Sequence, residues 1–200
     1  MYAAFYLLTI VGMVGAYDVL YYHIYKLRLY QHHDALWENF THLVRALLFA
    51  VMLLTVLHVR AAGWWWFLYP TLLGFELLNT MSDVILEPRS RRNIGGLPPV
   101  EYALHIFLSL TTGAALASIV WATHDKIGAP SSLRLETLEV SPLILAGAYS
   151  SIVMALSMFS FELYGFRKLL ANRGPKSPLP ADMSSNPMPK APMPKAAKTS

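Results

Sequence analysis

The sequence predicts an all-α membrane protein: a bundle of five transmembrane helices followed by a disordered C-terminal tail. Of its 200 residues, 55% are hydrophobic and only 14% are charged, whereas soluble domains carry about 25% charged residues. Several apolar stretches reach the length of about 20 residues that is needed to cross the hydrocarbon core of a bilayer. The sequence contains no cysteine, which excludes disulfides, thiolate metal ligands and cysteine nucleophiles.

We expect the spans at residues 2–22, 36–59, 64–86, 100–123 and 142–166. The first span has no basic segment before it and no small-residue cleavage site after it, so we expect it to be retained and not removed as a signal peptide. The run Trp64-Trp65-Trp66 lies where the chain re-enters the membrane, which is typical of an interfacial aromatic anchor.

Two regions follow from this reading, a transmembrane helical domain at 1–173 and a Pro/Lys-rich tail at 174–200. The tail lacks apolar periodicity, so we expect it to be disordered. Within the domain, Gly12 and Gly15 of the first span and Gly113 of the fourth are small residues of the kind that permit close helix approach.

The Lys and Arg residues predict the orientation. With five spans, the loops 23–35 and 87–99 share one side with the tail, and that side holds twelve of the sixteen basic residues against three on the other, with Arg45 inside the second span. Because basic loops stay in the cytoplasm, we expect the N-terminus outside and the tail inside, in a bacterial inner membrane or its equivalent. The net charge of +4 then reflects orientation and predicts no nucleic-acid partner.

Acidic and histidine side chains gather where the first four spans reach this predicted cytoplasmic side. They are Asp18 and His23 at the first span, Glu38 and His42 at the second, Asp83 and Glu87 at the third, and Glu101 and His105 at the fourth. The last three pairs are each four residues apart, so both members project from one helix face. Ionisable groups inside a membrane cost about 2.5–3.5 kcal/mol each on insertion scales, and by default they mark function.

The same arrangement occurs twice and predicts two tandem helix-hairpin repeats. Asp18 precedes Glu38 by twenty residues and Asp83 precedes Glu101 by eighteen, and each Asp is followed by Val and then by Leu or Ile. Two hairpins in the same orientation imply a pseudo-two-fold axis along the membrane normal. Such an axis through a four-helix bundle would bring matched ligand sets face to face.

We therefore predict that these eight side chains bind two divalent metal ions. The pattern resembles the di-metal carboxylate bundles, in which Glu and His from four helices hold two ions, although those proteins use Glu-x-x-His and the Glu/His pairs here are four residues apart. Nitrogen and oxygen ligands rich in carboxylates favour iron, with manganese or zinc as alternatives.

Other charged residues have simpler interpretations. We expect Arg45 to neutralise surplus carboxylate charge, Glu162 to pair with Arg167, and Glu76 to lie behind the ligands or to relay protons. Arg91 belongs to a run of three arginines that is explained by orientation in the membrane or by binding of lipid phosphate.

The function that these features favour is a membrane oxidoreductase, whose di-iron centre activates oxygen and oxidises a lipid-soluble substrate that enters between helices. A dinuclear-metal hydrolase acting on lipid head groups is a neighbouring possibility. The alternatives are an ion or proton transporter, a haem b electron carrier with His42 and His105 as axial ligands, and an assembly subunit without catalysis whose tail contacts an acidic protein partner. Gly-rich phosphate loops and nucleophile-elbow serines are missing from the sequence.

Overall fold

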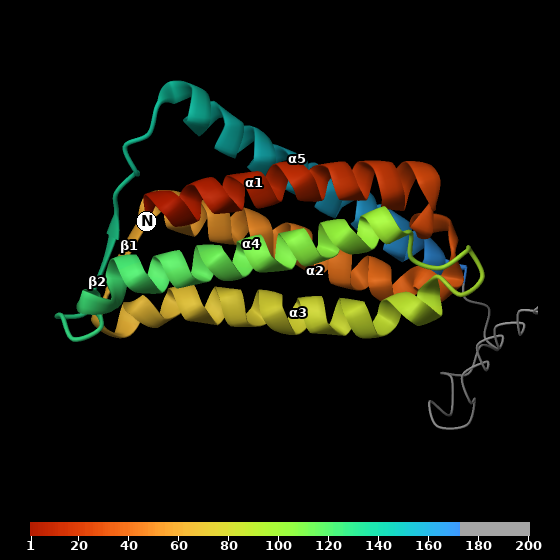
Figure 1. Cartoon of the computed structure of the whole chain (residues 1–200), viewed down its shortest axis with the longest axis horizontal. Helices are drawn as coiled ribbons and strands as arrows, with labels where there is room; N and C mark the ends of the chain where they lie inside the picture. Colours follow the sequence, from red (N-terminus) through yellow and green to blue (C-terminus); the bar gives the residue numbers. More distant parts are fainter. Residues whose placement is uncertain (173–200) are drawn as a thin grey trace, which may run out of the picture.

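The computed structural model describes residues 1–172, so the tail predicted at 174–200 lies outside the described residues. Long helices and one small sheet make up the fold (Figure 1). The helices are α1 (Tyr2–Asp18), α2 (Leu36–His58), α3 (Leu68–Ser90), α4 (Pro99–Thr123) and α5 (Pro142–Ala171), and the strands are β1 (Val59–Ala62) and β2 (Ser132–Leu135). The prediction of an all-helical bundle is confirmed for this part of the chain.

Four helices in the described part are long and apolar enough to cross a membrane. They are α1 with its continuation to Lys26, α2, α4 and α5. Helix α3 is as long as α2, with 23 residues, but it does not qualify, because Glu76, Asp83 and Glu87 lower its mean hydropathy. The fifth span predicted at 64–86 is therefore a helix in the structure but is not confirmed as a span.

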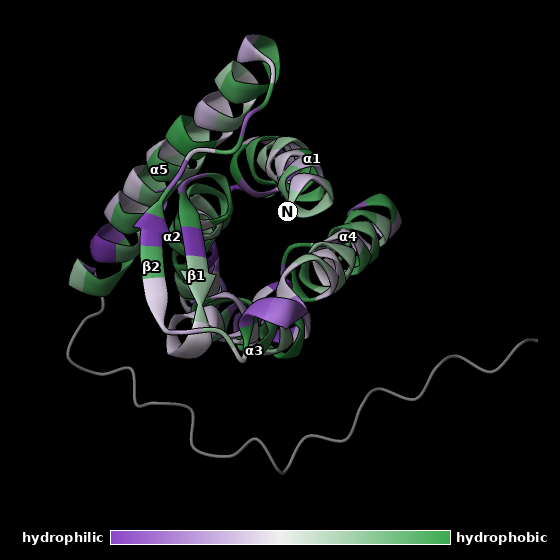
Figure 2. Ribbon diagram, turned by 90° about the vertical axis from the view of Figure 1, so that its left-hand side faces the viewer, coloured by the Kyte–Doolittle hydropathy of each residue, from purple (hydrophilic) through white to green (hydrophobic). Residues whose placement is uncertain are grey.

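Helices α1 to α4 surround a common axis, and α5 lies outside them, crossing the bundle obliquely (Figure 2). Helix α1 packs along α4, α2 packs along α3, and α5 packs mainly on α2. In contrast, α3 and α4 make few contacts with each other, although a short loop joins them.

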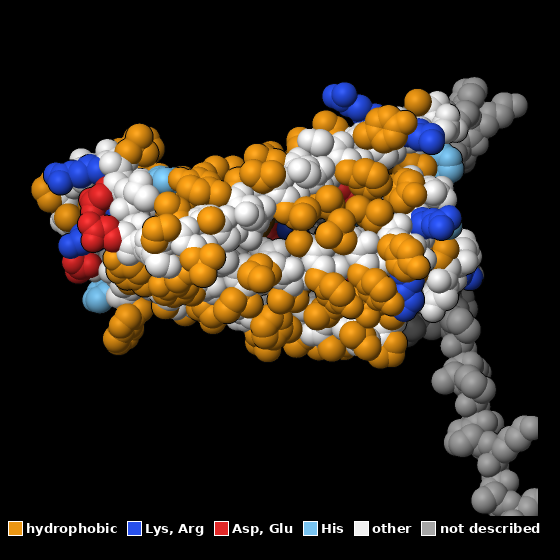
Figure 3. Space-filling view, turned by 90° about the horizontal axis from the view of Figure 1, so that it is seen from above, with side chains coloured by type: hydrophobic (Ala, Val, Ile, Leu, Met, Phe, Trp, Pro, Cys, Tyr) orange, Lys and Arg blue, Asp and Glu red, His pale blue; other side chains and the backbone are white. Residues whose placement is uncertain are grey.

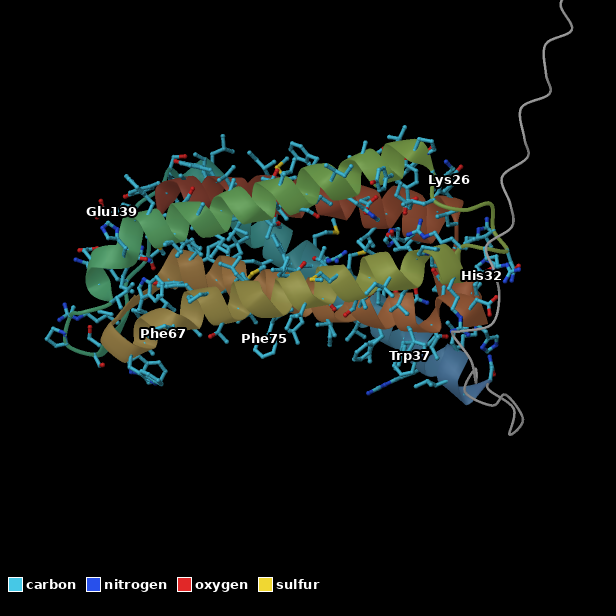
Figure 4. The ribbon with its side chains drawn as sticks, turned by 60° about the horizontal axis from the view of Figure 1, so that its bottom comes forward. Lys26, His32, Trp37, Phe67, Phe75 and Glu139 are labelled. Atoms are coloured by element: carbon cyan, nitrogen blue, oxygen red, sulfur yellow. The ribbon has the colours of Figure 1, made fainter. Side chains whose placement is uncertain are left out.

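The hydrophobic core fills the half of the bundle that lies away from the acidic side chains. Its fully buried members include Phe5 and Leu8 of α1, Leu53 of α2 and Ile119 of α4. We call this end of the molecule the tryptophan end, because Trp64–Trp66 form a 3₁₀ turn there before α3. The opposite end, which carries Asp18, His23, Glu101 and His105, is called the histidine end. Figure 4 shows Phe67 and Glu139 at the tryptophan end and Lys26, His32 and Trp37 at the histidine end.

The tryptophan end contains a short sheet that the sequence analysis did not predict. Strand β1 pairs antiparallel with β2, from Val59 opposite Leu135 to Ala62 opposite Ser132. Trp66 is buried and donates from Nε1 to Thr123 Oγ1 at 2.8 Å, which ties the start of α3 to the end of α4. Trp64 is 77% exposed, so its role as an interfacial anchor stays a prediction, whereas the buried Trp66 is not available for that role.

The outer surface of the bundle suits a lipid environment. Hydrophobic side chains cover most of its middle in Figure 3, and basic side chains gather at both ends. Phe75, in the first half of α3, points away from the bundle (Figure 4) and is 59% exposed. Extended exposed apolar surface is rare on soluble monomers and is typical of a surface that contacts a membrane or another protein.

The three glycines that were expected to permit close helix packing differ in the structure. A Cβ on Gly12 would overlap the ring of Phe49, so the absence of a side chain at Gly12 lets this ring of α2 pack against α1. A Cβ on Gly15 or Gly113 would meet nothing within 4 Å. The expectation therefore holds for Gly12 only, and the other two glycines leave open space.

Candidate metal centre

A widened helical turn places the first histidine of the site. Helix α1 continues directly into a π-helix, Val19–Lys26, whose hydrogen bonds join residues five apart. His23 follows Asp18 by five residues, and its Nε2 lies 3.6 Å from Asp18 Oδ2. In an α-helix, with 3.6 residues per turn, the same spacing would rotate the two side chains about 140° apart.

Asp18, His23 and Glu101, which are buried, and His105, which is half-buried, form a cluster that we call the four-residue cluster. One potential ligand atom from each lies within 4.8 Å of all the others. His105 Nε2 is 3.1 Å from Asp18 Oδ2, and His23 Nε2 is 3.2 Å from Glu101 Oε1. Glu101 and His105 are one helical turn apart on α4, which packs along α1. The cluster is therefore built by the packing of these two helices.

Several buried atoms in and beside this cluster make no hydrogen bond within the described part of the protein. They are Asp18 Oδ1, Glu101 Oε2, Glu87 Oε1 and His42 Nε2. Glu87 Oε1 is only 2.9 Å from His105 Nδ1, but the two groups are not aligned for a hydrogen bond. An unpaired buried polar atom costs about 1–3 kcal/mol, and a bound cation would remove that cost at the carboxylates.

Arg91 holds the carboxylates of two helices together at the histidine end. Its side chain is fully buried and donates to Glu38 from Nη2 at 2.5 Å and from Nε at 2.9 Å, and it also donates from Nη1 to Glu101. Ser90 Oγ donates to the second oxygen of Glu38. Burial lowers the pKa of the Arg91 guanidinium, but the charges of Glu38 and Glu101 raise it by more, so Arg91 stays protonated.

This role of Arg91 was not predicted from the sequence. The arginines at 89, 91 and 92 were all expected to set orientation or to bind lipid phosphate, whereas only Arg91 is fully buried. Its spacing of four residues from Glu87 was a usable signal, because that spacing places the two side chains on one helix face. Arg91 Nη2 indeed lies 3.8 Å from Glu87 Oε1.

His42 and Asp83 form a second group beside the four-residue cluster. His42 Nδ1 lies 3.1 Å from His23 Nδ1, and His42 Nε2 lies 3.3 Å from Asp83 Oδ1 without hydrogen-bond alignment. Asp83 accepts hydrogen bonds from Thr41 Oγ1 at 2.6 Å and from Arg45 Nη1 at 2.9 Å. The expectation that Arg45 neutralises carboxylate charge is confirmed for Asp83.

Two other acids from the sequence analysis also lie inside the bundle. Glu76 accepts from Arg45 Nε at 3.0 Å. Glu162 of α5 is only 2% exposed, and its Oε2 has no hydrogen-bond partner in the described part of the chain. No ion pair joins Glu162 to Arg167 among the described residues, so the expected pairing of these two side chains is wrong.

A cavity of about 360 Å³ leads from these polar groups into the bundle. Asp18, His23, His42 and His105 lie at its polar end. Toward the tryptophan end its walls are apolar and include Met52, Leu73 and Leu116. The arrangement can therefore present an apolar molecule to the four-residue cluster.

The eight predicted ligands thus belong to one connected group. Four of them form the cluster, and Glu87 contacts His105. Glu38 is connected to the cluster through Arg91. His42 contacts His23, and Asp83 contacts His42. Whether all eight bind metal stays a prediction. Comparisons of the sequence with protein-family models and curated proteins, and of the fold with solved structures, find no match.

Proposed function

We propose that this chain is a membrane metalloprotein that binds a divalent metal ion through Asp18, His23, Glu101 and His105. The observation that carries the proposal is the approach of four ligand atoms, from three buried residues and the half-buried His105, to within 4.8 Å of one another. Two carboxylates balance the charge of a divalent ion, and the histidines can bind it as neutral imidazoles. Charge balance matters here because an uncompensated buried charge is costly.

Two histidines and two carboxylates are a ligand set that iron accepts readily, with manganese and zinc as alternatives. The second ion predicted from the sequence would depend on Glu38, His42 and Asp83. The hydrogen bonds that Arg91 gives to Glu38, and that Arg45 gives to Asp83, satisfy part of these carboxylates without a metal. We therefore propose one ion at the four-residue cluster, and a second ion stays a prediction.

We propose further that the protein is an oxidoreductase for a lipid-soluble substrate, with dioxygen as the electron acceptor. When bound, the metal supplies redox and Lewis-acid chemistry. The residues of the chain hold the ligands in place, and the apolar walls of the cavity keep water from the cluster. The support is the continuity of the cavity with Asp18, His23 and His105.

We also propose that α3 crosses the membrane as a fifth span. Its acidic residues Glu76, Asp83 and Glu87 are all buried inside the bundle, whereas Leu78 and Ile85 are 61% and 69% exposed on its outer face. A helix with inward charges and an apolar outer face can contact lipid although its mean hydropathy is low.

Matched contacts support the two tandem repeats. Asp18 lies 3.1 Å from His105, and Asp83 lies 3.3 Å from His42. Likewise α1 packs along α4, and α2 along α3. A repeat with this symmetry keeps the orientation proposed from the basic residues, with the histidine end in the cytoplasmic leaflet.

Metal analysis of protein purified in detergent tests the proposal. We expect about one equivalent of iron, manganese or zinc per chain, and loss of the metal in Asp18→Asn and His105→Gln. His124→Gln is the matched control, because His124 is exposed at the tryptophan end. Protein that folds but holds no stoichiometric metal when iron, manganese or zinc is supplied would end the proposal.

A proton or ion pathway is the second candidate. One observation favours it: Arg45 links Glu76 to Asp83, which extends the polar groups of the cluster about 10 Å along α3 toward the middle of the bundle. Proton or cation flux in proteoliposomes that is lost in Glu76→Gln would support this function. Flux equal to that of empty vesicles would remove it.

A further inference from the structure

The cavity opens sideways toward the membrane, between α3 and α4. Its most exposed wall residues on α3 are Leu77 and Val84, with 61% and 56% of their surfaces exposed. On α4, Ser109 and Gly113 line the cavity and are also exposed. These two helices make few contacts with each other. We call the gap between the four residues the portal.

Glycines leave room in the walls of the cavity. Gly15 of α1, Gly74 of α3 and Gly113 of α4 all line it, and a Cβ on any of them would meet nothing within 4 Å. Close helix packing therefore does not explain these glycines. A glycine inside a helix costs about 0.5–1 kcal/mol of stability relative to alanine. What these three glycines share is that each leaves open space in a different wall, which widens the cavity.

The length of the cavity suits an extended molecule. On α3 its wall runs from Pro70 to Val84, which corresponds to about 21 Å of helix. On α4 it runs from His105 to Leu116, or about 16 Å. The walls between the two ends are mostly apolar, with Leu73, Leu108 and Met158 among them. Such walls favour a hydrocarbon chain or a narrow ring system over a polar solute.

The polar end of the cavity offers hydrogen-bond acceptors. Asp18 Oδ1 and Glu162 Oε2 are buried without hydrogen-bond partners in the described part of the protein, and both side chains line the cavity. Asp18 and Glu162 are only 4% and 2% exposed. A carboxylate oxygen accepts and does not donate, so its best neutral partner is a hydroxyl group.

We propose that the cavity binds a membrane-dissolved alcohol, a molecule with a long apolar body and one terminal hydroxyl, which enters through the portal. The hydroxyl lies at the Glu162 carboxylate at the polar end of the cavity, and the apolar body extends toward Met52 and Leu116. This deepens the proposed function by naming the substrate class, and it rests on that function only for the reaction. Binding of the alcohol itself needs no metal.

Photolabelling in lipid nanodiscs tests the inference. The probe is hexadecanol with a diazirine near the far end of its chain. We expect labelled peptides from the apolar walls, around Leu116 and Met52, and competition by excess hexadecanol that is about tenfold stronger than by hexadecane, because the hydroxyl adds a hydrogen bond to a buried carboxylate. Equal competition by the two compounds would overturn the recognition of a hydroxyl.

Two variants locate the binding site. Gly113→Leu fills the portal and should reduce labelling about tenfold, whereas Ala114→Leu, on the exposed neighbouring position outside the cavity wall, should leave it unchanged. Glu162→Leu should remove the preference for hexadecanol over hexadecane. Unchanged labelling in Gly113→Leu, or an unchanged preference in Glu162→Leu, would overturn the proposed entrance or head-group site.

Metal content measured on the same samples separates the two proposals. Gly113→Leu that keeps the metal content of the unmodified chain but loses labelling supports the alcohol site, and the retained metal shows that the variant folds. If the unmodified chain folds without bound metal but is still labelled, the missing metal refutes the metal centre and the labelling supports the alcohol site. Stoichiometric metal without specific labelling would refute the alcohol site alone.

Discussion

His23 and His42 stack on each other, with ring centroids 4.2 Å apart and Nδ1 atoms 3.1 Å apart. If His23 gives Nε2 to a metal, its Nδ1 carries the proton and donates to His42 Nδ1. His42 would then orient a ligand from behind, as residues next to metal ligands commonly do. A direct role of His42 as a ligand, as predicted from the sequence, requires a second ion on the side of Asp83.

The first prediction separates these two roles. In His42→Ala we expect metal affinity to fall about 10- to 100-fold while the stoichiometry stays at one ion, because the change removes an orienting contact and not a ligand. Metal titration by calorimetry measures both quantities, with His33→Ala, an exposed histidine, as control. A fall from two ions to one would instead assign His42 to a second metal.

The second prediction concerns metal removal. A metal that binds only the folded chain stabilises it by about 2.7 kcal/mol at a free concentration one hundred times Kd. We therefore expect the thermal transition of the purified protein to fall on treatment with a chelator and to recover when metal is added back. His105→Gln should unfold at one temperature with and without metal, and a chelator effect as large in this variant as in the parent would contradict the assignment of His105.

The third prediction concerns Arg91. Replacing it with Met leaves Glu38 and Glu101 buried without their cation, and breaking a buried ion pair in this way costs about 3–5 kcal/mol. Arg89→Met is the matched control, because Arg89 is exposed two residues earlier, and we expect it to change stability by less than about 0.5 kcal/mol. Thermal unfolding in one detergent compares the two variants.

A double variant tests the pairing of Arg91 with Glu38. Adding Glu38→Gln to Arg91→Met removes one of the two unpaired charges, so part of the lost stability should return. Additive losses in the double variant would show that the two side chains do not act as a pair.

The fourth prediction contrasts two glycines of α1. Gly12→Ala should lower stability by about 1–3 kcal/mol, because the new methyl group would press on the ring of Phe49. Gly15→Ala should raise stability by about 0.5–1 kcal/mol, because nothing occupies the space around its Cβ. Thermal unfolding of both variants measures the difference, and the same sign for both would be inconsistent with this packing.

The apolar runs predicted where the five helices lie, but not all of their ends. The structure ends α2 at His58 and α4 at Thr123, within one residue of the predicted ends, whereas α3 and α5 extend four and five residues beyond theirs, to Ser90 and Ala171. Long apolar runs determine where helices lie, because backbone groups in a membrane must bond within their own segment. The pairing of β1 with β2 was not predicted, because four-residue strands carry no periodicity that separates them from loops.

The site was predicted in composition but not in connectivity. The i,i+4 spacing of Glu101 and His105 placed both on one face of α4, and in the structure this face meets α1 at the four-residue cluster. Spacing could not reveal that the side chain of Arg91, which follows α3, folds back and donates to both Glu38 and Glu101. That contact depends on the three-dimensional path of the loop, which single-helix periodicity does not encode.

The π-helical turn after Asp18 determines which side chain of the chain faces the Asp18 carboxylate. In its present form the residue five places on, His23, faces the carboxylate. If the turn tightened to an ordinary α-helix, the residue four places on would take over, and that residue is Tyr22. An imidazole would then be exchanged for a phenol by a local change of winding.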